Sequence, residues 1–264
     1  MKFIFEDNRS EKEERIANAA LNNNWLISDI FKKNEISPYQ DEKTRLKWAP
    51  VLSSLAFGES TAFYGFGKRI AESPDISTKS WLTIHLCDES KHAEGFSWLL
   101  HYLYPSYRGK LDSLLKSKDV YVFYGHTHRC DTLLQWLLCT QIAEVFGSHC
   151  YKALHEQLDY EPVAKTFFKY ILTDESRHIA YIANLIQKKR EEISDSEWQH
   201  HYCHFIEKMI TLARNMFETR KKGSNYQCFE SIGVNVTAFC DKAQSNLYKK
   251  LLVNSINEIQ EVAQ

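Results

Sequence analysis

Apolar residues recur at spacings of three and four along most of the chain, which is the pattern of amphipathic helices. Between residues 41 and 72 the apolar stripe consists of Leu46, Ala49, Leu52, Leu55, Ala56, Phe63 and Phe66. Pro50 falls inside this stripe, so the helix either begins or kinks there. The same spacing predicts helices at 11–22, 75–102, 127–158, 162–190 and 194–221, with one or two shorter helices within 226–261. We therefore expect an all-α fold.

Capping residues and prolines mark the ends of these helices. Ser73 is the expected N-cap of the second long helix, with Pro74 at its first position. Ser194 and Glu197 have the spacing of a capping box, which predicts the start of the fifth long helix. VYVFYG at 120–125 has strand-like propensity, but an isolated strand would lack a partner. We expect this segment to be an aromatic connection packed on the helices.

The chain is expected to form a single domain over residues 1–264. It contains no low-complexity stretch and no linker rich in glycine and serine. The long helices predict a core bundle at about 41–190, preceded by a short helix and followed by a helical extension at 191–264.

Composition narrows the classes of function. Charged residues make up 25% of the chain and the formal net charge is −1, so bulk charge favours neither a nucleic acid nor an anionic membrane as partner. The start, MKFIFEDNRSEKEER, lacks the apolar run of a signal peptide, and no apolar stretch approaches the roughly 18 residues of a membrane helix. The seven cysteines include no C-x-x-C pair and their number is odd. This pattern indicates reduced thiols in a cytoplasmic protein.

The most informative pattern is a pentad that occurs twice. DESKH begins at residue 88 and DESRH at residue 174, an offset of 86 residues. In each pentad a glutamate and a histidine are three residues apart, so Glu89 and His92 share one helical face, as do Glu175 and His178. The repetition suggests a duplicated unit in which other functional residues recur at the same offset.

Two further glutamates fit this duplication. Glu59 lies 30 residues before Glu89, and Glu144 lies 31 residues before Glu175; both are in apolar, mid-helix surroundings. A glutamate there is costly to bury unless it is paired, protonated or bound to metal. Four carboxylates and the two pentad histidines form a ligand set for two metal ions in a helical bundle. Oxygen donors with imidazole suit Fe(II) or Mn(II).

The other charged pentad positions have plausible supporting roles. Asp88 and Asp174 are expected to accept a hydrogen bond from the second ring nitrogen of a ligating histidine, which would fix its tautomer. Lys91 and Arg177 could offset the local negative charge. The alternative is that these residues are solvated helix charges.

The pentads resemble the (Asp/Glu)-Glu-x-Arg-His fingerprint of the ferritin-like di-iron carboxylate superfamily, in particular its oxygen-activating branch. Asp174 to His178 match it fully, and Asp88 to His92 match it with lysine in place of arginine. The resemblance covers about residues 41–190 and implies a ferritin-like four-helix bundle with additional N- and C-terminal helices. It also implies two iron ions, or a mixed Mn/Fe pair, as cofactor and O2 as co-substrate.

Missing features separate the branches of this superfamily. Rubrerythrins usually have a C-x-x-C iron module, which is absent. The ribonucleotide reductase small subunit resembles this chain but has a radical tyrosine four residues after the first histidine, where this chain has Phe96. Tyr64 and Tyr181 are near the expected ligands in sequence, but neither matches that pattern, and both are interpreted as core or rim packing residues. The resemblance to the other branches therefore implies an O2-activating non-haem di-iron oxygenase or hydroxylase, which is expected to oxidise a small organic or carrier-tethered substrate.

Residues about one turn from the ligands are candidates for the catalytic pocket. Ser148 lies four residues after Glu144, where several relatives have a hydroxyl implicated in oxygen activation or proton delivery, so it is the candidate catalytic residue. A mid-helix serine more often bonds its own backbone, which is the alternative. Gly147 either opens space for substrate or allows close helix packing. The expected lining consists of Leu55, Phe63, Thr140, Gly147 and Ser148.

His85 is a candidate seventh ligand, because it lies four residues before Glu89 on the same helical face. The equivalent position in the second half is Ile171, so an orienting donor or a core histidine are alternatives. Arylamine N-oxygenases of the superfamily also have a third histidine, which makes amine N-oxygenation an alternative function. A tRNA-modifying hydroxylase and a non-catalytic metal-binding protein are further alternatives. No flavin, nicotinamide or iron–sulfur motif is present, so we expect an external electron donor, and a homodimer is compatible with the sequence.

Overall fold

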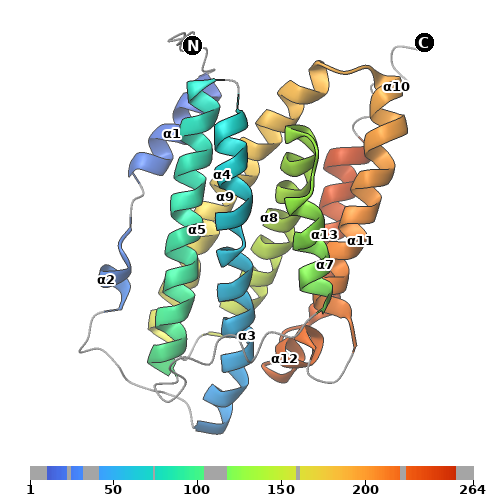
Figure 1. Cartoon of the computed structure of the whole chain (residues 1–264). Coiled ribbons are helices and arrows are strands. Elements are labelled where there is room, and N and C mark those ends of the chain that lie inside the picture. The colour runs from blue at the N-terminus through green and yellow to red at the C-terminus, as the bar shows by residue number, and fades with distance from the viewer. Residues whose placement is uncertain are drawn as a thin grey trace. The chain divides into compact units, whose positions relative to one another are not determined.

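The computed structural model describes residues 11–22, 25–31, 42–73, 75–103, 118–158, 161–220 and 224–253, and all structural statements below concern these residues. They form helices, with no strand among them (Figure 1). None of the described helices is both long and apolar enough to span a membrane. The helices fall into two compact units, and the long helix α9 (Pro162–Glu191) contributes residues up to Tyr181 to the first unit and the rest to the second.

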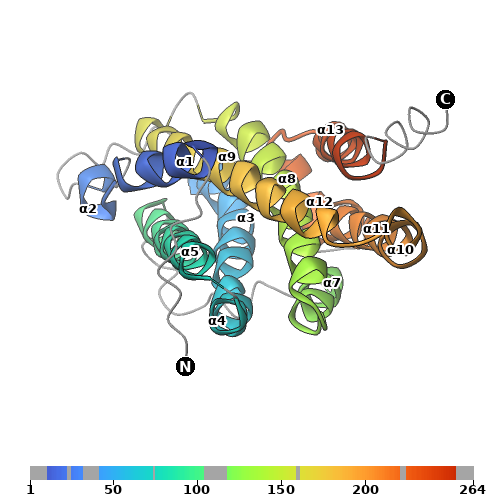
Figure 2. The ribbon, with the colours of Figure 1, turned by 90° about the horizontal axis from the view of Figure 1, so that it is seen from above.

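The first unit contains both pentads. Its helices are α1 (Glu11–Asn22), α2 (Ile27–Ile30), α3 (Glu42–Ser60), α4 (Ala62–Glu72), α5 (Ile76–Leu103) and the first part of α9. Helix α5 packs along α3 and α4, which follow one another, and contacts α2 (Figure 2). Apolar residues such as Val51 and Leu52 of α3 and Leu82 of α5 are fully buried. The helix that the sequence predicted over 41–72 is divided in the structure into α3 and α4 by an interruption at Thr61. Pro50 lies inside α3.

The second unit contains the C-terminal helices. It consists of α7 (Lys118–His128), most of α8 (Leu133–His155), the end of α9, α10 (Asp195–Glu197), the π-helix η2 (Trp198–Cys203), α11 (His204–Glu218), α12 (Asn225–Ser231), α13 (Val236–Tyr248) and the π-helix η3 (Lys249–Val253). Helix α11 lies against α7 on one side and α13 on another. The Ser194 hydroxyl accepts a hydrogen bond from the Glu197 backbone N–H at 3.2 Å, which confirms the predicted N-cap.

Two further sequence-based expectations about element boundaries were wrong. Residues 120–125 are not a connection but part of helix α7, so the following helix begins at Leu133 rather than near Thr127. Ser73 ends α4 and its hydroxyl donates to the Arg69 carbonyl oxygen, whereas the Asp75 side chain accepts the Thr78 N–H at 2.7 Å at the start of α5. An aspartate satisfies the free N–H groups of a first helical turn as well as a serine does, so it takes the role predicted for Ser73. Pro74 lies outside the described residues.

Candidate metal centre

Five of the six predicted ligands meet within the first unit. Glu59 comes from α3, Glu89 and His92 from α5, and Glu175 and His178 from α9, and all five are buried. The ligand atoms of Glu59, Glu89, His92 and Glu175 lie within 4.8 Å of one another. The three-residue spacing within each pentad puts the glutamate and the histidine on the same inward face, so the sequence pattern produces the cluster directly.

The ring nitrogens of the two pentad histidines make similar contacts, one histidine at each end of the cluster. Nδ1 of His92 lies 3.3 Å from Oε2 of Glu59 and 3.5 Å from Oε1 of Glu175, and its Nε2 lies 3.2 Å from Oδ2 of Asp174. The His92 ring therefore has one nitrogen directed at the cluster and the other at an aspartate.

The aspartates contact the histidines in a crossed arrangement. Nδ1 of His178 lies 3.2 Å from Oε1 of Glu89, while its Nε2 lies 3.2 Å from Oδ2 of Asp88. Asp88 thus bonds the histidine of the second pentad, and Asp174 bonds the histidine of the first. Because α5 and α9 lie side by side, each helix orients the imidazole of the other.

These contacts test whether the residues fit a metal. A carboxylate only accepts hydrogen bonds, so the Nε2 atoms that face the aspartates must bear protons. In a neutral imidazole the Nδ1 atom then has only a lone pair, and in both rings this lone pair faces a glutamate oxygen. Two electron-rich atoms about 3 Å apart repel unless a proton or a cation lies between them. The buried set of carboxylates and inward lone pairs therefore fits divalent metal ions.

Two basic residues of the pentads neutralise the aspartates. The guanidinium of Arg177 donates to Asp174 and lies 3.4 Å from Asp88, and the ammonium of Lys91 is 2.7 Å from Asp88. Burial raises the pKa of the Asp88 carboxyl, but hydrogen bonds with His178 and Lys91 outweigh it and hold that pKa well below its usual value. Burial also raises the pKa of Asp174, and the His92 hydrogen bond likewise turns the net shift downward. Both aspartates are therefore ionised acceptors at neutral pH.

The serines at the centres of the pentads have a local role. The Ser90 hydroxyl donates to the Leu86 carbonyl oxygen, and the Ser176 hydroxyl donates to the Leu172 carbonyl oxygen, both at 2.8 Å. Each serine therefore bonds its own helix one turn back rather than the cluster.

Trp25 supports one of the two aspartates beside the cluster, a role that the sequence did not reveal. It is buried, its indole N–H donates to Oδ2 of Asp174 at 2.8 Å, and the Lys91 ammonium lies 5.0 Å from its ring centre. The Asp174 oxygen that contacts His92 thus accepts a second hydrogen bond. The short stretch NNNWLISDI gives no clear periodic signal, so only the fold could place Trp25 beside Asp174.

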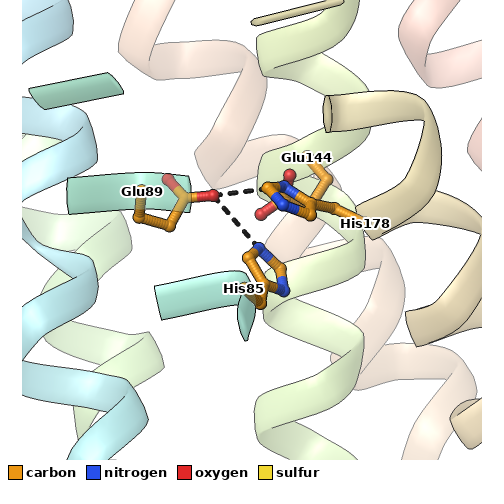
Figure 3. Close-up of side chains that lie close together, drawn as sticks. All are labelled: His85, Glu89, Glu144 and His178. Atoms are coloured by element: carbon orange, nitrogen blue, oxygen red, sulfur yellow. Dashed lines mark hydrogen bonds and ion pairs between the residues drawn. The ribbon is translucent and has the colours of Figure 1, made fainter. Parts of the chain in front are cut away.

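His85 joins the His178 end of the cluster. Its Nε2 lies 3.1 Å from Oε1 of Glu89, the same oxygen that faces Nδ1 of His178. Figure 3 shows both contacts from this oxygen, in a view that also draws Glu144 of α8. Burial raises the pKa of the Glu89 carboxyl, but its contacts with Glu59, His178 and His85 outweigh this effect and hold the pKa well below the ordinary value.

The remaining predicted residues lie on α8 in the second unit or on α3 and α4 in the first unit. Glu144 is buried at 8% exposure, Thr140 is buried and donates to the Trp136 carbonyl oxygen, and Ser148 and Gly147 are half-buried. Leu55 is buried on α3, but Phe63 on α4 is 50% exposed, so the prediction that it lines a pocket was wrong. Phe63 belongs to α4, which begins at Ala62 beyond the interruption at Thr61.

Aromatic side chains fill the surroundings of the cluster. Phe96 is fully buried and its ring packs against Phe167 and Phe168, so no phenol occupies that position. Tyr181 is buried and stacks on Trp81 at 4.1 Å between ring centres, as expected of a packing residue. Tyr64 is 81% exposed, so this tyrosine is not a core residue.

Comparison with known proteins identifies the fold. No family model and no curated protein sequence matches the chain, but solved structures match it over nearly its full length. The ribonucleotide reductase R2 subunit from Clostridium botulinum is 20% identical with a TM-score of 0.70, and the match covers 96% of this chain and 88% of that chain. The fold is the ferritin-like fold of the R2 proteins. This finding confirms the predicted all-α, ferritin-like fold class.

Two other R2-like structures extend this likeness. Dimanganese(II)-NrdF of Streptococcus sanguinis is 13% identical with a TM-score of 0.73, covering 95% of this chain and 89% of that chain. A variant of an R2-like ligand-binding oxidase with an Mn/Fe cofactor is 13% identical with a TM-score of 0.64, covering 93% and 94%. At these identities the likeness establishes the R2-like fold, and the chemistry of the site has to be argued from its residues.

Proposed function

We propose that the protein is an O2-activating non-haem di-iron oxygenase or hydroxylase that oxidises a small organic or carrier-tethered substrate. The observation that carries this proposal is the pair of crossed Asp–His contacts, which leave Nδ1 of His92 and of His178 directed at buried glutamates. Such an arrangement is expected of a centre that binds two divalent ions in a helical core.

We assign the metal ligands as the six residues predicted from sequence. Glu59, Glu89, His92, Glu175 and His178 contribute from the first unit, and Glu144 is proposed as the fourth carboxylate. Its burial on an apolar helix and its spacing of 31 residues from Glu175, against 30 between Glu59 and Glu89, support that role. Four carboxylates would balance the charge of two divalent ions. R2-like oxidase structures with Mn/Fe and Fe/Fe cofactors support iron, alone or with manganese.

When bound, two irons would supply O2 binding and the electrons for its reduction, which is chemistry that no side chain provides. The chain's own task is to hold the ligands in place and to exclude bulk water. Asp88 and Asp174 retain the imidazole protons on Nε2, and Arg177 and Lys91 keep both aspartates anionic. We assign Ser148 as the candidate proton donor of the site, on the basis of its position one turn after Glu144. An external protein or small-molecule reductant would supply electrons, and the expected location is cytoplasmic.

The proposal is tested by anaerobic loading of the protein with Fe(II), followed by exposure to O2. We expect two irons per chain by elemental analysis and a transient absorption band after O2 is added. Glu89→Gln should lose iron, because an amide neither neutralises the ion nor binds it as well. The matched control Glu94→Gln changes an exposed glutamate on the same helix and should keep both irons. Protein that binds two irons and is inert to O2 would refute the oxygenase function.

Amine N-oxygenation is a second candidate, favoured by the placement of His85 beside Glu89 and His178. Incubation of iron-loaded, reduced protein with an arylamine and O2 should then yield a product one oxygen atom heavier, with the oxygen on nitrogen. Loss of this product in His85→Ala with retained iron would support the candidate. Equal turnover in both proteins would remove it.

A further inference from the structure

His85 occupies a fixed position at one end of the metal centre. It is fully buried, and its ring stacks on the ring of His178 with 3.7 Å between centres and an angle of 22°. The Phe66 ring also makes an edge-to-face contact with the His85 ring, with ring centres 4.6 Å apart. These contacts leave the imidazole little freedom to rotate, so the direction of its Nε2 toward the cluster is set by packing.

The distances around Glu89 are those expected for ligands of one ion. Nε2 of His85 and Nδ1 of His178 lie 3.1 Å and 3.2 Å from the same oxygen, Oε1 of Glu89. Metal–ligand bonds of about 2.1 Å at right angles place neighbouring donor atoms about 3 Å apart. The ligand atoms of these three residues also lie within 4.8 Å of one another. A single ion can therefore contact all three.

The duplication of the chain does not account for His85. In the second half the equivalent position is Ile171, which is also fully buried. The same asymmetry extends one turn outward, where Trp81 meets Tyr181 at one end while Phe167 fills the space beside Gly95 at the other. An apolar residue is therefore compatible with this layer of the fold, and the imidazole is an addition to one end only.

We propose that His85 binds metal through Nε2, so that the ion at the His178 end has two imidazole ligands and the ion at the His92 end has one. This inference rests on the proposed metal centre. A second imidazole on one ion makes the two metal positions chemically unequal. Imidazole suits iron and the later metals, whereas carboxylate suits manganese. The His85 position should accordingly take iron, and the position with Glu59, His92 and Glu175 should tolerate manganese.

Paramagnetic proton NMR of the protein loaded with Co(II) alone counts the imidazole ligands. A histidine bound through one nitrogen retains an N–H on the other, and direct bonding to Co(II) shifts that proton far outside the normal range. Such resonances are recognised because they are absent from protein refolded in D2O. We expect two Co(II) ions and three such resonances per chain. Two ions with only two resonances would overturn the role of His85 and leave the metal centre intact.

Two variants assign the third resonance. His85→Gln, or His85→Ile if the glutamine variant folds poorly, should lose a shifted resonance, whereas His101→Gln, a change on the same helix, should keep all three. Three resonances that persist without His85 would overturn the proposal. Fewer than two Co(II) ions per wild-type chain would overturn both this proposal and the proposed function, so the two failures are distinguishable.

Discussion

At the scale of single residues, each position of the repeated pentad has a defined partner. The aspartate bonds the histidine of the opposite pentad, the glutamate and histidine face the cluster, the serine bonds its own helix and the basic residue pairs with aspartate. The sequence revealed the inward residues, because spacing of three on a helix is a local property. It did not reveal which aspartate serves which histidine, because that depends on how α5 and α9 pair.

Asp174→Asn tests the crossed contact. An asparagine amide can present its NH2 group to Nε2 and so favour the wrong tautomer of His92. We expect metal affinity to fall by about 10- to 100-fold, measured by competition with a chelator of known affinity. Asp131→Asn, at an exposed aspartate, is the control and should not alter affinity. Wild-type affinity in Asp174→Asn would contradict the role of this carboxylate.

Thiol reactivity is a second test at the residue scale. Burial, with a smaller contribution from Glu218, raises the pKa of the Cys240 thiol to about 12. At pH 8 only ~1 in 10⁴ of these thiols is ionised, and the thiolate is the reactive form. Cys87 is exposed. Treatment of the folded protein with a thiol-alkylating reagent, followed by peptide mass spectrometry, should show Cys87 labelled and Cys240 protected. Equal labelling rates would contradict the burial of Cys240.

At the scale of helices, hydrophobic spacing was a better guide than residue propensity. Val120, Phe123 and Thr127 are buried at helical spacing in α7, although the β-branched and aromatic residues of VYVFYG suggested an irregular segment. Tertiary packing against α11 overrides that local preference. The interruption at Thr61 was also missed, because the apolar pattern continues across it. The long helices that hold the pentads were predicted well, since their apolar stripes are uninterrupted.

Gly95 tests the packing between α5 and α9. A Cβ atom there would lie 2.2 Å from Cε2 of Phe167, whose ring is fully buried and cannot move aside easily. Gly95→Ala should lower the free energy of unfolding by about 1–3 kcal/mol, measured by urea denaturation. Gly67→Ala is the matched control, because nothing lies within 4 Å of its added Cβ, and it should raise stability by up to about 1 kcal/mol. A stabilising Gly95→Ala would show that the close approach of Phe167 is wrong.

At the scale of the whole molecule, a cluster of buried carboxylates opposes folding through desolvation and mutual repulsion, and bound metal should relieve this. Addition of Fe(II) or Mn(II) to chelator-treated protein should raise the thermal midpoint under anaerobic conditions. A metal concentration of 100 times Kd corresponds to about 2.7 kcal/mol of added stability. Glu175→Gln should respond much less than Glu94→Gln. An unchanged midpoint in the wild type would contradict metal binding by the folded state.

The crossed bonds between the pentads have a consequence for how such a centre could arise. In the folded chain the aspartate of each pentad bonds the histidine of the other pentad, so a half-length ancestral chain with one pentad would lack that partner. Two copies would have to associate before either imidazole received this bond. If the chain descends from such a half, its metal chemistry began at the interface of a dimer, and gene fusion made that interface the interior of a single polypeptide.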